Sequence, residues 1–142
     1  MSNLKKDIIT QSAYDVLNKA RIDAEEHRNP FITPEHVLYS MGANPDFHRV
    51  LGIIGLPCSF FSDRLIYYLD CLYSVKLGSS YSVQLSKALC FVLDEAIITA
   101  CQGRDSAVDL PHILFGISCL NDSVAGYLIR KHPEIIDAFK KS

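Results

Sequence analysis

The sequence carries one short pattern twice: residues 32–38 are ITPEHVL, and residues 108–114 are VDLPHIL. In each copy a residue with a side-chain oxygen, Thr33 or Asp109, is followed three positions later by a histidine and then by aliphatic residues. Thr and Asp are favoured N-cap residues, because their oxygens accept a hydrogen bond from a free N–H of the first helical turn. The pattern therefore predicts two capped helix starts.

The similarity extends well beyond these heptads. Residues 12–46 align with residues 88–122 without a gap, and nine of the 35 positions are identical. A stretch of this length, covering a long helix, a loop, a cap and a second helix, indicates an internal repeat. Each copy is too small to bury its apolar face alone, so we expect the two to share one core across a pseudo-two-fold axis.

Apolar periodicity and turn residues then divide the chain into helices. The segments expected to be helical are residues 5–26, 34–42, 45–54, 59–72 and 82–103, followed by a sixth helix capped by Asp109, a seventh and a short eighth that Pro133 opens. Ser82 is expected to cap the fifth helix, and Asn121–Asp122 to start the seventh. No segment alternates strictly enough for a strand. We expect an all-α fold of two pseudo-symmetric four-helix repeats in one domain, with repeat one at about 5–72, a linker at about 74–81 and repeat two at about 82–140.

Composition narrows the function. The chain has 142 residues, 49% of them hydrophobic, a formal net charge of -2 and a pI near 6.2. Without a Lys/Arg cluster it is not expected to bind nucleic acid, and without a long apolar run it is not expected to be secreted or to span a membrane. The cysteines are odd in number, form no C-x-x-C pair and mostly sit in apolar runs, which predicts reduced core thiols of a cytoplasmic protein. They are Cys58, Cys71, Cys90, Cys101 and Cys119.

The two histidines of the repeated pattern need an explanation. His36 and His112 fall at the third helical position, from which a side chain reaches back to the backbone of the N-cap. This structural role is favoured over metal ligation, since no H-x-x-x-H or cysteine pair supplies further ligands. A small hydrolase or metal-binding protein using these histidines stays an open alternative. No phosphate-binding glycine motif and no G-x-S-x-G occurs, so we expect no enzymatic activity, no cofactor and no metal.

Two longer stretches resemble a known family. They are residues 24–38, AEEHRNPFITPEHVL, and residues 125–132, AGYLIRKH. Together with the double motif they are similar to the N-terminal, or Clp repeat, domain of Clp AAA+ unfoldase chaperones, and most similar to the ClpA type. The resemblance covers about residues 8–140.

The resemblance implies a non-catalytic domain tethered above ATPase rings that are absent from this chain. Such a domain recruits adaptor proteins and protein substrates for unfolding. In ClpA-like members the adaptor is ClpS, and the unfolded protein passes to the ClpP protease. A stand-alone Clp-repeat protein that regulates a Clp chaperone is the alternative.

Candidate partner-binding residues follow from both arguments. Glu35 matches a glutamate that helps ClpC-like relatives to recognise phosphoarginine, and its counterpart in the second repeat is Pro111. Pro30 stands where ClpA-like members carry an acidic adaptor contact, and residues 82–87 match another adaptor-facing segment. Cations after the two long helices complement the helix dipole or contact a partner. The full set is Arg28, Pro30, Thr33, Glu35, Ser82, Lys87 and Arg104.

Overall fold

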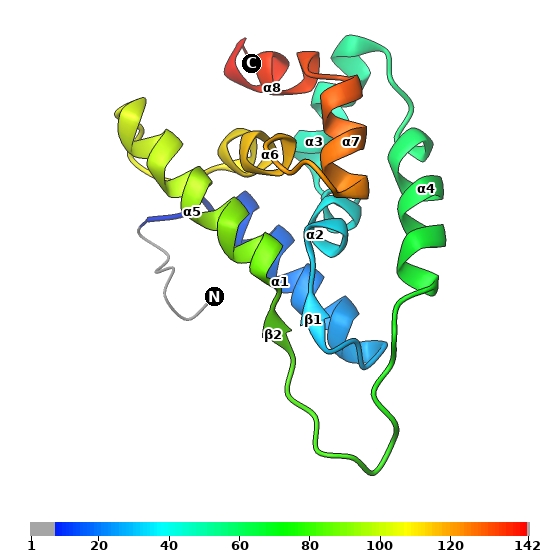
Figure 1. Cartoon of the computed structure of the whole chain (residues 1–142). Coiled ribbons are helices and arrows are strands. Elements are labelled where there is room, and N and C mark those ends of the chain that lie inside the picture. Colours follow the sequence, from blue (N-terminus) through cyan, green and yellow to red (C-terminus); the bar gives the residue numbers. More distant parts are fainter. Residues whose placement is uncertain (1–7, 142) are drawn as a thin grey trace.

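The computed structural model describes residues 8–141, and this part of the chain forms eight α-helices and two very short strands (Figure 1). The all-α prediction is confirmed. In chain order the elements are α1 (Gln11–Glu26), β1 (Phe31–Ile32), α2 (Pro34–Met41), α3 (Pro45–Ile54), α4 (Ser59–Asp70), β2 (Gln84–Leu85), α5 (Lys87–Gln102), α6 (Leu110–Ser118), α7 (Val124–Lys131) and α8 (Glu134–Lys141).

The helix caps that the repeated pattern predicts are present. Thr33 caps α2 and Asp109 caps α6, and in both cases the histidine three residues later completes a capping box by accepting the N-cap backbone N–H. Asn44 caps α3, accepting from the backbone of Phe47 at 3.0 Å. These starts are encoded locally, because cap and partner lie within one helical turn.

Other helix boundaries differ from the prediction. The N-cap of α1 is Thr10, so residues 8–10 are not helical, while residues 5–7 of the predicted helix lie outside the described residues. Ser86, and not Ser82, caps α5, and Ser123, rather than Asn121–Asp122, caps α7. Ser82 was a reasonable cap by residue type, but the chain that follows it is held extended by pairing with β1, which delays the helix by four residues.

This pairing joins the two halves of the chain. β1 and β2 run parallel, with Ile32 opposite Leu85, and an isolated parallel bridge joins Ile9 to Val108. The two pairings are equivalent under the 76-residue repeat. In both, the N-cap residue of the long helix donates its backbone N–H to the carbonyl of the other half, at 3.0 and 2.9 Å. Each half therefore fixes the entry into the long helix of the other.

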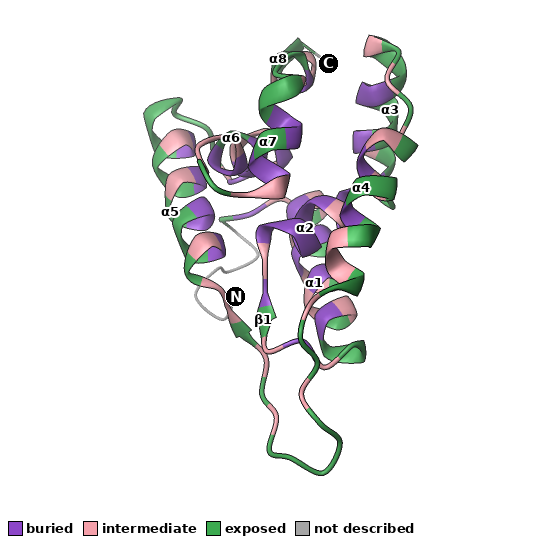
Figure 2. Cartoon of the chain, turned by 45° about the vertical axis from the view of Figure 1, so that its right-hand side comes forward, coloured by how far each residue is buried: buried purple, intermediate pink, exposed green. Residues whose placement is uncertain are grey.

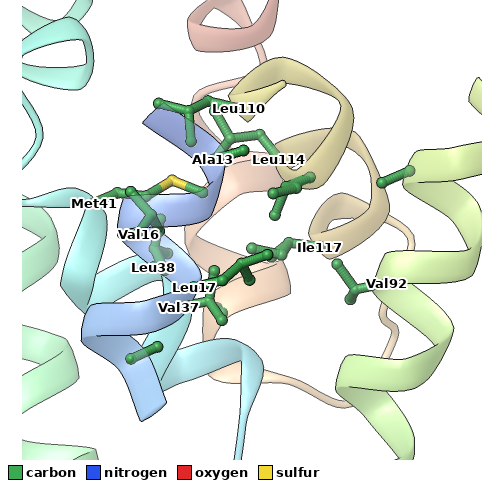
Figure 3. Close-up of a cluster of buried hydrophobic side chains, with 14 of the residues drawn as sticks. Ala13, Val16, Leu17, Val37, Leu38, Met41, Val92, Leu110, Leu114 and Ile117 are labelled. Atoms are coloured by element: carbon green, nitrogen blue, oxygen red, sulfur yellow. The ribbon is translucent and has the colours of Figure 1, made fainter. Parts of the chain in front are cut away.

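One core serves both halves. Within each half the first two helices pack together, α1 on α2 and α5 on α6, and across the halves α3 packs on α8 and α4 on α7. Purple, buried segments face inward from nearly every helix (Figure 2). Figure 3 shows side chains of both halves meeting in the centre. They include Ala13, Val16, Leu17, Val37, Leu38, Met41, Val92, Leu110, Leu114 and Ile117.

The cysteines do not occupy the core. All five thiols are free, Cys58 and Cys119 are half-buried, and Cys71, Cys90 and Cys101 are exposed. The prediction of core thiols was wrong because neighbours in an apolar run of a helix point in different directions: Leu89 is buried while the adjoining Cys90 faces outward.

Candidate functional site

The two long helices end in the same unusual way. Arg28 and Arg104, one residue past each helical cap, have φ of +50° and +58°. The following residues, Asn29 and Asp105, donate their backbone N–H groups to carbonyls five residues back, at 2.9 Å each. This is the Schellman arrangement, in which the left-handed position is usually a glycine. Both turns carry an arginine at this position. Each turn brings the next residue, Asn29 or Asp105, within hydrogen-bond distance of the capping histidine.

In the first half this turn creates a closed hydrogen-bond network. His36 Nδ1 accepts from the Thr33 backbone N–H at 3.0 Å and lies 2.8 Å from the Thr33 hydroxyl. Since Nδ1 is the acceptor, the ring proton sits on Nε2, which donates to Asn29 Oδ1 at 3.0 Å. Asn29 in turn donates to the Tyr73 carbonyl at 3.0 Å. The imidazole is thereby held neutral and in one tautomer.

Burial reinforces this state. Desolvation lowers the pKa of His36 from 6.5 to about 4, against the smaller opposite effects of the Glu35 and Asp23 carboxylates. A neutral partner, the Asn29 amide, offers no compensating charge. His36 is therefore a structural residue whose charge is disfavoured, as the capping interpretation predicts.

The second half repeats the network with a charged partner. His112 Nδ1 accepts from the Asp109 backbone N–H at 2.9 Å, and Nε2 donates to Asp105 Oδ2 at 2.7 Å. Asp109 also accepts from the Thr10 hydroxyl at 2.7 Å, which ties this cap to the start of α1. The two networks thus share their geometry and differ in charge.

A cavity opens beside each capping histidine. The first cavity, about 270 Å³, lies between the C-terminal half of α1, α2 and α4, and its lining includes Asp23, Asn29, His36, Tyr39, Leu69 and Asp70. The second cavity, about 450 Å³, lies between α5, α6 and α8, and its lining includes Thr99, Asp105, His112, Phe115, Ile136 and Lys140. The two are equivalent under the repeat: Asp23, Asn29, His36 and Tyr39 correspond to Thr99, Asp105, His112 and Phe115. These cavities are the main candidate binding sites, and the sequence analysis did not identify them.

The Arg28 side chain has a structural role, since it bonds within the fold. Its guanidinium donates to the carbonyls of Val75, Lys76 and Ser79 at 2.9, 3.1 and 3.2 Å. It also lies over the Tyr81 ring, 4.7 Å from the centroid. The side chain therefore fixes the loop between α4 and β2. Arg104, at the equivalent position, is exposed, and its guanidinium has no hydrogen bond or ion pair with any residue from 8 to 141.

The Glu35 side chain also has a structural role. Its side chain is buried, with 4% exposure, and Oε2 accepts from the Ser123 hydroxyl at 2.7 Å and the Ala125 backbone N–H at 3.0 Å. It therefore stabilises the N-terminus of α7, in the other half of the chain. Thr33 is likewise engaged in its capping box.

Three of the predicted contact residues gather at one edge. The Pro30 carbonyl accepts from the Gln84 backbone N–H at 3.2 Å, which brings the start of β1 beside residues 82–87. Ser82 and Lys87 are exposed on this edge. Arg104 lies apart, past the opposite end of α5. The strand pairing thus sets Pro30 beside the segment that carries Ser82 and Lys87, and we call these three residues the β edge.

Two general features complete the description. Within residues 8–141, no group of three or more His, Cys, Asp or Glu side chains is arranged to hold a metal ion. None of the helices in this part of the chain combines the length and the apolarity needed to cross a membrane.

Comparison with known proteins gives one family and several related structures. The family model of the Clp repeat (R) N-terminal domain matches residues 8–132. The Hsp104 N-terminal domain from Candida albicans superposes with a TM-score of 0.76 at 19% identity, covering 94% of this chain and 87% of that one. The ClpD N-terminal domain from Arabidopsis thaliana gives 0.69 at 14% identity, covering 99% and 97%. A ClpV N-domain in complex with a VipB peptide gives 0.68 at 20% identity, covering 93% and 88%.

Proposed function

The chain belongs to the family of Clp repeat N-terminal domains, and from this we propose that it is a non-catalytic docking domain that recruits adaptors and protein substrates to a Clp chaperone. The more specific form of the proposal is a ClpA-like unfoldase that receives clients from a ClpS-like adaptor and delivers them to ClpP. The chaperone's ATPase modules would supply the chemistry, and this domain would supply recognition.

The second cavity is the observation that carries the proposal. Its volume falls within the range of small-ligand and peptide side-chain sites. Phe115, 41% exposed, and Ile136 offer apolar surface, while Asp105, His112 and Lys140 provide polar groups of both signs at the same opening. Apolar surface with a few convergent polar groups suits a segment of unfolded protein, which presents both kinds of group.

The β edge is the proposed adaptor contact. Ser82 and Lys87 are exposed there, and Pro30 fixes the backbone beside them. Docking an adaptor at the β edge, beside the start of α5, leaves the second cavity open to a client, because the cavity is lined by Thr99 and Asp105 at the opposite end of that helix. Glu35 and Thr33 belong to neither surface: Thr33 caps α2, directly after β1, and Glu35 holds the start of α7, so both would contribute only by stabilising the fold.

A binding titration tests the proposal. Fluorescein-labelled, unfolded casein is titrated with the domain and followed by fluorescence anisotropy, and a ClpS-like adaptor is titrated in parallel. Phe115→Ala should weaken casein binding about tenfold, the loss typical of a central apolar contact. Ile98→Ala, on an exposed face of α5 outside the cavity, is the matched control and should leave it unchanged.

Lys87→Glu provides the second arm. It reverses a charge on the β edge and should weaken adaptor binding while leaving casein binding intact. If the wild-type domain binds neither casein nor adaptor, the docking proposal is wrong.

A further inference from the structure

One carboxylate in the lining of the first cavity has an oxygen without a hydrogen-bond partner. The His36 ring and the Asn29 side-chain amide already have hydrogen-bond partners: they bond to each other and to backbone groups. Asp23 Oδ2 is buried and has no hydrogen-bond partner, the one such side-chain atom found among residues 8–141. Buried polar groups are nearly always paired, so a missing partner calls for an explanation. An ionised carboxylate only accepts, so the missing group must be a donor.

The electrostatics of the cavity favour a cationic donor. α1 and α4 both end beside it, and neither has a basic residue in its last turn. The negative ends of two helix dipoles therefore face the same space as Asp23 and Asp70. Lys19 also lines the cavity: its Nζ lies 3.5 Å from Asp23 Oδ1, and 46% of its side chain is exposed, so it pairs with one carboxylate oxygen and leaves Oδ2 without a partner. The Asp23 side chain keeps 21% exposure and lines the cavity, so its carboxylate is accessible to a ligand there.

The walls limit the size and shape of the ligand. Tyr39, Ile66 and Leu69 line the cavity with apolar surface. At about 270 Å³ it is smaller than the usual range for drug-sized ligands and suits one long side chain. Lys and Arg carry their charge at the end of an aliphatic stem that packs well on such walls.

The equivalent cavity shows that the fold does not require this charge. Thr99 replaces Asp23 there, and its hydroxyl is satisfied by the Glu95 carbonyl at 2.7 Å. α8, which closes the second cavity, contributes Lys140, whereas α4 contributes Asp70 to the first. Both linings thus include a lysine, Lys19 in the first cavity and Lys140 in the second, but only in the second does the closing helix supply it.

We infer that the first cavity binds the cationic side chain of an arginine or lysine residue in a partner peptide, with Asp23 as the buried acceptor and Asp70 at the rim. The guanidinium or ammonium group would pair with the Asp23 carboxylate while its stem packs between Tyr39 and Leu69. This site is separate from the second cavity, so it stands or falls independently of client binding there.

Peptide probes on the wild-type protein give the first test. The amide spectrum of the ¹⁵N-labelled domain is titrated with acetyl-Gly-Arg-Gly-amide, its lysine counterpart and its citrulline counterpart, which has nearly the shape of arginine without the charge. The arginine and lysine peptides should shift resonances around Asp23, Tyr39 and Leu69, and citrulline should bind at least tenfold more weakly. Equal binding of citrulline, or shifts confined to other surfaces, would overturn the inference. Free arginine binding as tightly as the peptide would assign the site to a small molecule and overturn the peptide part.

Matched variants give the second test. Asp23→Asn should weaken the arginine peptide at least tenfold, and Asp15→Asn, an exposed carboxylate earlier on the same helix, should change it less than twofold. Because the variant removes a carboxylate with one unpaired oxygen and only a partly exposed ion pair to Lys19, the Tm of Asp23→Asn should stay nearly equal or rise. A lower Tm together with unchanged peptide binding would show Asp23 to be structural. Phe115→Ala should not affect the arginine peptide, which separates this site from the second cavity.

Discussion

Mild acid should destabilise this domain through one histidine. The pKa of His36 is about 4 in the folded protein, because burial disfavours the imidazolium, against 6.5 for an exposed histidine. The unfolded chain therefore binds the proton more readily, and the contribution of neutral His36 is present above pH 6.5 and is lost as the pH falls toward 4. Between pH 7 and pH 5 the two pKa values correspond to a loss of about 2 kcal/mol of unfolding free energy.

Urea unfolding followed by circular dichroism at pH 7, 6 and 5 measures this loss. His36→Gln is the informative variant, since glutamine at the third helical position also completes a capping box but does not titrate. It should lower stability at pH 7 by about 1 kcal/mol, through the lost bond to Asn29, and remove most of the acid sensitivity. His112→Gln makes the same change in the second half, where the ring faces the Asp105 carboxylate.

The pattern across the variants decides the outcome. The wild type should lose about 2 kcal/mol more than His36→Gln between pH 7 and pH 5. Equal acid sensitivity in these two proteins would refute the assignment to His36. If only His112→Gln lost the acid sensitivity of stability, the histidine responsible would be His112 in the second half.

Four further substitutions test individual contacts and turns that hold the fold together. Glu35→Ala should lower the unfolding free energy by about 2–3 kcal/mol in urea unfolding, because it leaves the Ala125 backbone N–H and the Ser123 hydroxyl without their acceptor; a loss below about 0.5 kcal/mol would contradict that role. Arg104→Gly should raise stability by about 0.5–1 kcal/mol by relieving a positive φ, whereas Arg28→Gly should lower it, since the guanidinium there holds three carbonyls; the same sign for both would refute the distinction. Gly116→Ala should cost about 1–3 kcal/mol and lower the Tm, as its Cβ would lie 2.6 Å from the Val92 carbonyl oxygen where α5 and α6 touch; an unchanged Tm would show that this contact yields freely.

Local features of the fold could be predicted from the sequence. The caps at Thr33 and Asp109 and the capping role of both histidines are confirmed, because each depends on residues within one turn. The strands were missed, since two residues show no periodicity and their partners lie more than fifty positions away. A signal was available: extending the 76-residue alignment backward places Thr10 on Ser86 and so marks both as N-caps.

The candidate sites were harder to predict from the sequence than the helix caps. The cavities depend on how α4 and α8 close over the capped helices, and nothing in the local sequence reports that. Glu35 looked like an exposed carboxylate at a helix start, but its partners are 88 and 90 residues away. Arg28 and Arg104 occupy equivalent positions, as the alignment predicts, yet only Arg28 meets a loop that can accept its hydrogen bonds. Whether the predicted residues contact a partner stays a prediction.

The contacts between the halves also determine when each part of a nascent chain can complete its packing. Glu35 must wait for Ala125, made 90 residues later, before its carboxylate has a backbone partner. At about 5–20 residues per second on a ribosome, that interval is roughly 5–18 s. During it the first four helices expose apolar faces that only the second half covers. Until the second half is made, the first half therefore exposes apolar surface like that of the unfolded proteins that this domain is proposed to recruit.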